Sequence, residues 1–202
     1  MRHVTRRLLL VGLAATPAAC NGLLPAAPPP PKLFTLTPVP QFPPGTPVSW
    51  QLLVDTPVST AALDTERIAL KRSPITVDYF ADAAWTDRAP AMVQALIVQS
   101  FENSGRIPAI ARESLALRAD YVLQLELRHF EADYQGAAAP EAHVQIAARL
   151  VKMPDRAIIA ERSFEASAKA AENSTPAIVE AFNSAFHQVT REMVGWTLAA
   201  AR

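Results

Sequence analysis

Histidines and acidic residues are the side chains of this sequence whose spacing could support chemistry. His129 and His143 fall on neighbouring expected strands, so they can meet across a hairpin, as a metal site or an acid–base pair would need. Glu161 and Glu165 fall on one face of a third expected strand, but paired carboxylates act as acid and base only in a cleft that shifts a pKa. A solvent-exposed strand face explains both pairs, so we expect no catalytic residue, no metal and no cofactor.

The remaining residues offer no further catalytic signature. The six glycines form neither a phosphate-binding loop nor a nucleophile elbow. Serines and acids are frequent enough to assemble a triad in space, but no spacing selects one. We therefore expect that the protein is not an enzyme. A pocket that placed His129 or His143 beside an acid would favour the alternative, a hydrolase.

The single cysteine, Cys20, stands where an acylation site belongs. Residues 1–19 begin with arginines and no acid, continue with the apolar run Leu8–Ala15 and end in small residues, which is typical of a secretory signal. The cysteine directly after Ala19 resembles a bacterial lipobox. This pattern predicts cleavage between Ala19 and Cys20 and lipidation of Cys20. Pro17 stands where lipoboxes carry an aliphatic residue, so an ordinary secretory signal is the alternative.

The charge balance excludes one large class of function. The whole chain has 19 basic and 19 acidic residues, and cleavage before Cys20 would remove three arginines and no acid, leaving a net charge of −3. A protein that binds nucleic acid by counterion release needs a basic surface. We therefore expect no nucleic-acid partner.

Prolines divide the chain into three parts. Ten of the 18 prolines fall between Pro25 and Pro47, and such a stretch cannot be helical because each proline fixes φ and lacks an amide donor. At about 3.1 Å per residue in an extended chain, residues 21–31 would span roughly 35 Å. We expect a signal peptide over 1–19, a lipidated cysteine and proline-rich tether over 20–47, and a domain over 48–202.

Hydrophobic periodicity predicts an α+β domain in the order strands, helix, strands, helix. Asp87 and Pro90 begin the first helix, Gly105 ends it, and Thr175-Pro176 begin the second. The apolar phase slips at His129-Phe130, which predicts a β-bulge. We expect a mostly antiparallel sheet with the two main helices packed on one face. The expected strands cover residues 34–36, 50–54, 67–71, 76–80, 121–127, 144–150 and 158–166.

A series of short motifs, in this order and spacing, resembles one protein family. The motifs are Phe34-Thr-Leu36-Thr-Pro38, Leu52-x-Val54-x-x-Pro57, Leu63 with Arg67-Ile68, Asp78-Tyr79-Phe80 leading to Trp85 and Pro90, Asp120-Tyr121-x-Leu123 and Phe130-Glu131. From Cys20 almost to the C-terminus, the chain resembles the ABC-type transport auxiliary lipoproteins, which include paraquat-inducible protein C.

This resemblance implies an adaptor of the bacterial cell envelope. Family members look like periplasmic domains anchored to the outer membrane, and they work with a permease, an ATPase and an MCE-type substrate-binding protein in lipid traffic between the two membranes. The resemblance assigns a role to one residue, Cys20, whose attached lipid would anchor the protein in the phospholipid membrane. The resemblance is also compatible with a homo-oligomer in which several copies of this chain form a ring. The alternatives are a structural or assembly lipoprotein of another envelope machine and a lipid-anchored hydrolase.

Overall fold

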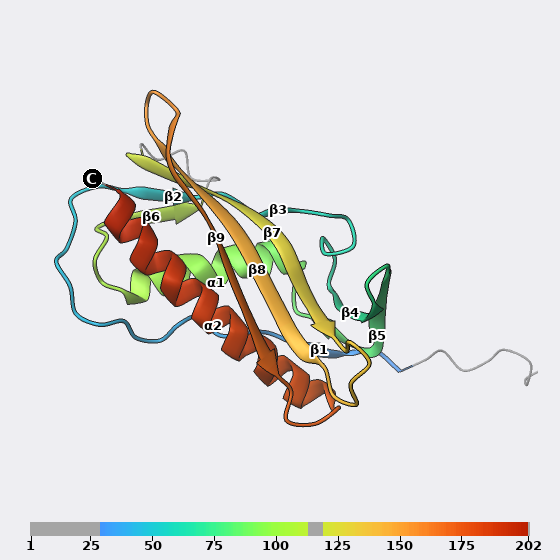
Figure 1. Cartoon of the computed structure of the whole chain (residues 1–202). Coiled ribbons are helices and arrows are strands. Elements are labelled where there is room, and N and C mark those ends of the chain that lie inside the picture. The colour runs from blue at the N-terminus through green and yellow to red at the C-terminus, as the bar shows by residue number, and fades with distance from the viewer. Residues whose placement is uncertain (1–28, 113–118, 202) are drawn as a thin grey trace, which may run out of the picture.

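The computed structural model describes residues 29–112 and 119–201. Within these ranges nine strands form one sheet, and two helices pack against it (Figure 1). The helices are α1 (Ala89–Asn103) and α2 (Thr175–Ala200). The strands are β1 (Lys32–Phe34), β2 (Leu52–Val54), β3 (Val58–Ser59), β4 (Arg67–Ser73), β5 (Thr76–Trp85), β6 (Ile110–Arg112), β7 (Tyr121–Asp133), β8 (Glu141–Lys152) and β9 (Ala157–Lys169).

Strand β7 lies at the centre of the sheet and is paired along both edges. Along one edge it pairs antiparallel with β8 from end to end, and β8 pairs antiparallel with β9. Along the other edge it pairs in turn with the short strands β2, β3 and β4, all parallel to it. In addition, β1 pairs parallel with β5, and β6 pairs parallel with β2. The sheet therefore contains both parallel and antiparallel pairs.

The expectation of a mostly antiparallel sheet is therefore only partly right. The meander β7–β8–β9 and the hairpin β4–β5 are antiparallel, as the sequence predicts. The short strands before α1 are parallel to β7 because the chain crosses over through α1 before β7 begins, and a crossover returns the chain to the same end of the sheet. The α+β class and the two main helices are confirmed.

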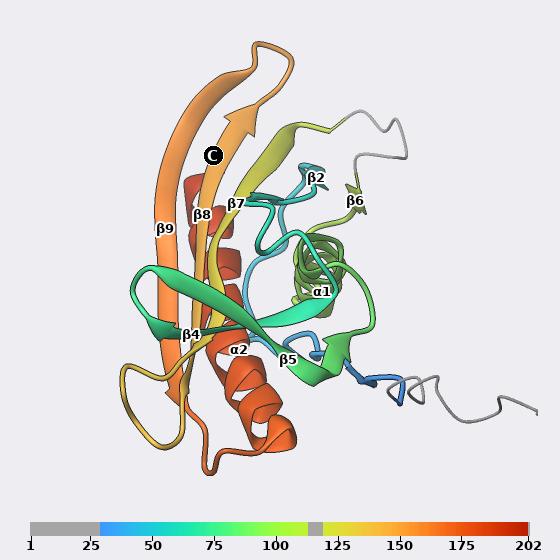
Figure 2. The same ribbon diagram turned by 90° about the vertical axis from the view of Figure 1, so that its right-hand side faces the viewer.

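Both helices lie on the same side of the curved β7–β8–β9 layer (Figure 2). Phe182 of α2 joins the helix to the sheet, since its ring centroid lies 5.3 Å from Trp85 of β5 and 5.1 Å from Phe130 of β7. Phe182 and Phe130 are 0% and 1% exposed. The apolar stripes predicted for the helices form the buried side of this core. They include Met92, Val93, Leu96, Ile97, Phe101, Ile178, Ala185, Phe186, Val189 and Met193.

The helices begin and end close to the predicted residues. The first helical residues are Ala89 and Thr175, each followed by proline. The predicted caps are displaced by one residue, because Arg88 precedes α1 and the Ser174 hydroxyl accepts the Ala177 amide at α2. Gly105 ends the α1 segment at φ +62°, a conformation that glycine adopts without strain.

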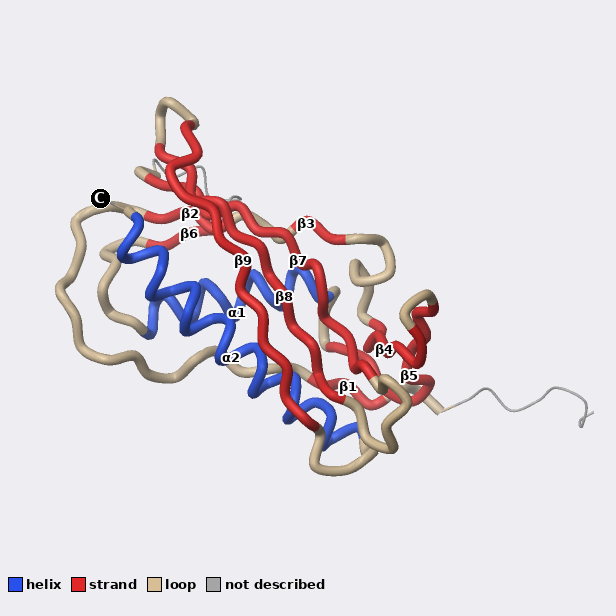
Figure 3. Tube along the Cα trace, viewed as in Figure 1, coloured by secondary structure: helices blue, strands red, loops and turns tan. Residues whose placement is uncertain are grey.

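The segment 35–51 runs as irregular chain from β1 to β2 past both helices (Figure 3), and we call it the strap. The Val39 amide donates to Ser100 Oγ at 3.0 Å, and Asn103 Nδ2 donates to the Val39 carbonyl at 2.8 Å. On α2, Asn183 Oδ1 accepts the Thr37 amide at 2.9 Å. Leu36 and Val39 are buried, so part of the strap packs into the core although it precedes residue 48.

Candidate functional site

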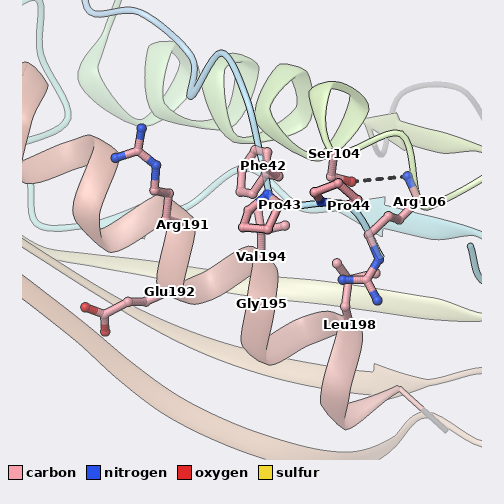
Figure 4. A pocket seen from close by; sticks show the side chains of 10 residues that line it. All are labelled: Phe42, Pro43, Pro44, Ser104, Arg106, Arg191, Glu192, Val194, Gly195 and Leu198. Atoms are coloured by element: carbon pink, nitrogen blue, oxygen red, sulfur yellow. Dashed lines mark hydrogen bonds between the residues drawn. The ribbon is translucent and has the colours of Figure 1, made fainter. Parts of the chain in front are cut away.

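A groove runs between the strap and the C-terminal half of α2 (Figure 4). Its volume is about 400 Å³. Phe42 and Pro43 of the strap lie over Val194 and Gly195 of α2, and Arg191 and Arg106 lie at opposite ends of this row. A side chain at Gly195 would project into open space, because no atom beyond its chain neighbours and the adjacent helix backbone lies within 4 Å of the position of its Cβ. The lining is completed by Pro44, Ser104, Glu192 and Leu198.

The strap fixes the position of Arg106. Its guanidinium Nε donates to the Thr46 carbonyl at 3.2 Å, and its own carbonyl accepts the Val48 amide at 2.8 Å. Gly45 allows this approach, since a Cβ there would lie 2.7 Å from the guanidinium carbon of Arg106. A groove with apolar walls and a cation held at one end can accept a ligand that has an apolar chain and an anionic group.

A second candidate site lies near the C-terminal end of β7. His129 of β7 and His143 of β8 meet across the hairpin, as their strand positions predict, with ring centroids 4.4 Å apart and planes 18° from parallel. Beside the Nδ1 edges of the two rings lies Glu131, which is only 3% exposed. The Glu131 Oε1 atom is 2.6 Å from His129 Nδ1, 4.0 Å from His143 Nδ1 and 2.8 Å from the Lys71 ammonium.

The pKa of Glu131 is set by opposing effects. Burial alone would raise it, but the Lys71 side chain, the His129 ring and the Phe130 amide, which donates to Oε2 at 2.7 Å, hold the pKa below its ordinary value of 4.5. The carboxyl group is therefore ionised at neutral pH. A general base works best with a pKa near the working pH, so this arrangement suits a bound cation better than proton transfer.

These residues line a pocket of about 630 Å³ together with the hairpin β4–β5. The pocket places both histidines beside an acid, which is the arrangement that would favour a hydrolase. Ser73 is the hydroxyl residue of the lining, and its Oγ pairs with Thr76 Oγ1 at 2.8 Å instead of with an imidazole. The pocket therefore brings together histidine and carboxylate but gives them no aligned nucleophile.

The predicted Glu161–Glu165 pair does not act as a unit. Glu165 Oε1 lies 2.7 Å from His143 Nε2, whereas Glu161 lies 3.4 Å from a guanidinium nitrogen of Arg149. Sequence patterns missed Glu131, which belongs to the histidine cluster, and Arg106, which belongs to the groove. The bulge predicted at His129 was the available signal for Glu131, since the register of β7 and β8 shifts between Leu127 and His129.

Two hairpin tips carry exposed apolar side chains. Ile75, at the β4–β5 turn, is 93% exposed, and Ile158 and Ile159, at the start of β9, are 58% and 39% exposed. In the part of the chain that the structure describes, β9 pairs only with β8, so its other edge is open to a further strand. Such edges and apolar tips are surfaces on which another protein can dock.

The predicted processing and lipidation sites, Ala19 and Cys20, lie outside the described residues. None of the helices within 29–112 and 119–201 combines the length and the apolar character that crossing a bilayer requires.

Comparison with known proteins identifies the fold and the family. The crystal structure of protein XCC0632 from Xanthomonas campestris superposes with a TM-score of 0.79 at 35% identity, over 84% of this chain and 95% of that one. A second crystal structure, 12% identical, shares the fold with a TM-score of 0.65 over 84% of this chain and 99% of the other.

A relative in Bradyrhizobium diazoefficiens, protein bll6063, is 33% identical over 154 residues, which are 76% of this chain. The match spans only 41% of the length of that relative. Residues 33–194 match the family described as the ABC-type transport auxiliary lipoprotein component, which confirms the resemblance seen in the short motifs. The chain belongs to the ABC-type transport auxiliary lipoprotein family.

Proposed function

We propose that this protein is a lipid-anchored auxiliary component of an MCE-type ABC transport system, held on the periplasmic side of the outer membrane. In this position it would assist lipid traffic between the two membranes. The family membership supports the transport role, and its description names a transport component, not a catalyst. The signal-like residues 1–19 followed by Cys20 support the anchor.

The groove beneath the strap carries the lipid part of the proposal. We assign it one acyl chain of an anionic phospholipid, because its walls are formed by Phe42, Pro43, Val194 and Leu198 while arginines lie at its two ends. The apolar chain would leave water along the groove, and the phosphate would pair with Arg106, which the strap already holds in place.

The partner contact is assigned to the open edge of β9. The outer face of the sheet is a poorer candidate, because its charges already pair with one another, as in Arg128–Glu126 and Arg149–Glu161. The β9 edge has strand geometry, and the exposed Ile158 and Ile159 lie at its start. An added strand from the MCE-type partner would gain backbone hydrogen bonds and cover both isoleucines.

The anchor is tested by Cys20→Ser with Asn21→Ser as the control that keeps the thiol. We expect Cys20→Ser to abolish labelling with palmitate and to release the protein from the membrane fraction, because one site carries all the acyl chains. Fractionation and labelling equal to those of the control would overturn the anchor.

The partner is tested by affinity purification from solubilised membranes. An Ile158→Glu/Ile159→Glu double variant is expected to lose an MCE or ABC component that the parent retains, whereas Ile75→Glu, at the other hairpin tip, retains it. Recovery of a different envelope machine would favour the assembly role, and recovery of further copies of this chain alone would assign the edge to a homo-oligomer.

The groove is tested by Gly195→Leu, which fills it from α2, with Ser184→Leu on an exposed position of the same helix as the control. Replacing glycine inside a helix does not weaken it intrinsically. We expect Gly195→Leu to lower phospholipid co-purification, measured by mass spectrometry of the extracted lipids, at least five-fold relative to Ser184→Leu. Equal lipid content in the two variants would contradict the assignment.

A further inference from the structure

We propose that His129, Glu131 and His143 form a binding site for a divalent transition-metal ion of the zinc type. One potential ligand atom from each residue lies within 4.8 Å of the other two. Two imidazole nitrogens and one carboxylate oxygen are a ligand set typical of zinc sites that keep a fourth position open. The pocket of about 630 Å³ next to the cluster leaves room for a water molecule or another ligand in that position.

The backbone holds the three residues in place before any ion arrives. Glu131 and His143 are direct partners in the antiparallel ladder of β7 and β8, and the bulge between Leu127 and His129 sets the register of this part of the ladder. The stacked rings of His129 and His143 both direct Nδ1 toward Glu131 Oε1, at 2.6 and 4.0 Å. Zinc–nitrogen bonds of about 2.1 Å place tetrahedral ligand atoms roughly 3.4 Å apart. Binding therefore requires the ligand atoms, which now lie within 4.8 Å of one another, to move closer together and the stacked rings to turn toward the ion.

A carboxylate supports one of the ligands from behind. His143 Nε2 lies 2.7 Å from Glu165 Oε1, and Gln145 Nε2 donates to Glu165 Oε2 at 3.2 Å. Metal-bound histidines usually donate their second N–H to a carboxylate, which fixes the tautomer and the orientation of the ring. Glu165, an exposed residue of β9, would accept the second N–H of His143 in this way.

Lys71 pairs with the same Glu131 oxygen that the ion would bind. Its ammonium lies 2.8 Å from Oε1, and the Lys71 side chain is 23% exposed. A metal ion would displace it toward the pocket, so one cation replaces another at a carboxylate that is too buried to remain unpaired. Removal of Lys71 should therefore strengthen metal binding, whereas in a purely structural ion pair its removal creates no binding site.

The test uses the full chain with Cys20→Ser, so that the thiol cannot bind the ion, after treatment with a chelator. We expect Zn²⁺ to bind at one equivalent, measured by competition with a chromophoric chelator, and Co²⁺ to give the intense visible absorption of a tetrahedral site. His129→Ala and His143→Ala should each weaken Zn²⁺ binding at least ten-fold, and Glu165→Gln about ten-fold. His187→Ala, on α2 beside Thr37 and not part of the cluster, should leave the affinity unchanged.

Lys71→Met separates a metal site from a structural network. We expect it to raise the Zn²⁺ affinity at least three-fold in protein whose circular dichroism matches the parent. Absence of one-equivalent binding, equal affinity in the folded His129→Ala/His143→Ala double variant, or no gain from Lys71→Met would each overturn the proposal. These outcomes are independent of lipid content and partner recovery, so the proposed transport function stands or fails separately.

Discussion

The ammonium of Lys71 on β4 lies 2.8 Å from the carboxylate of Glu131 on β7, although only 3% of the Glu131 side chain is exposed. The two strands are parallel neighbours at this point, with Ala69 opposite Glu131 and Lys71 opposite Asp133. A charge so far from water is tolerated only if cations or donors surround it. The pair thus links the hairpin β4–β5 to the centre of the sheet through electrostatics as well as through the backbone.

Lys71→Met should lower the free energy of unfolding of the metal-free protein by about 1–3 kcal/mol, because it leaves a buried carboxylate with one fewer partner. Urea unfolding at neutral pH measures the change. Lys152→Met, at the exposed end of β8, is the control and should stay within about 0.5 kcal/mol of the parent. Equal losses in the two variants would show that Lys71 does not stabilise Glu131.

Acid should destabilise the domain through Glu131. Burial opposes ionisation, but Lys71, His129 and the Phe130 amide outweigh it and hold the pKa of the folded carboxyl below 4.5. The folded state therefore binds this proton more weakly than the unfolded state. The stability from Glu131 is complete above about pH 4.5 and is lost as the pH falls through the lower folded pKa.

Urea unfolding of chelator-treated protein between about pH 6 and pH 3 measures this loss. Glu131→Gln should lose stability less steeply below about pH 4.5 than the parent does, since its side chain binds no proton. Curves of equal slope for the two proteins would assign the acid sensitivity to other groups.

Ser100→Ala should detach the strap from α1. The fully buried Ser100 Oγ accepts the Val39 amide and donates to the Leu96 carbonyl at 2.6 Å. The variant leaves the Val39 amide without this acceptor, at a cost of about 1–3 kcal/mol. Ser163→Ala, on an exposed site of β9, provides the baseline. Faster proteolysis within residues 35–51 in Ser100→Ala alone would confirm the local effect, and equal cleavage would refute it.

Gly45→Ala should move the guanidinium of Arg106 without unfolding the domain. Its Cβ would meet the end of a flexible side chain at 2.7 Å, so the arginine swings away from the Thr46 carbonyl and the backbone remains. We expect stability within about 0.5 kcal/mol of the parent and reduced binding to vesicles that contain anionic phospholipid, measured by flotation. Unchanged binding would show that the position of Arg106 does not matter.

Local patterns predicted the elements whose contacts are close in sequence. The stripes of α1 and α2, the β7–β8–β9 meander and the bulge beside His129 follow from periodicity, because one face of each element is buried. The meeting of His129 and His143 follows from the same pairing. Pro154 and Arg156 lie in the short turn that connects β8 and β9.

The parallel pairs and the strap could not be predicted in this way. Leu52 pairs with Tyr121 and Thr37 bonds to Asn183, across 69 and 146 residues respectively. The hydrophobic periodicity of a segment does not indicate which distant strand will pair with it. The prolines of the strap correctly exclude helix, but they do not show that Leu36 and Val39 are buried. Burial of Glu131 likewise depends on β4, whose position relative to β7 is set by the whole fold.

The parallel pairing of β1 with β5 determines how the domain would bear tension. The chain enters the fold at Lys32, opposite Ala83, and Phe34 lies opposite Trp85. A pull on the residues that precede β1 would load this short ladder before any other part of the sheet. Behind it, Val39 is fastened to Ser100 and Asn103. Force applied ahead of the domain would therefore meet two successive points of resistance, the β1–β5 ladder and then the hydrogen bonds of Val39 to α1.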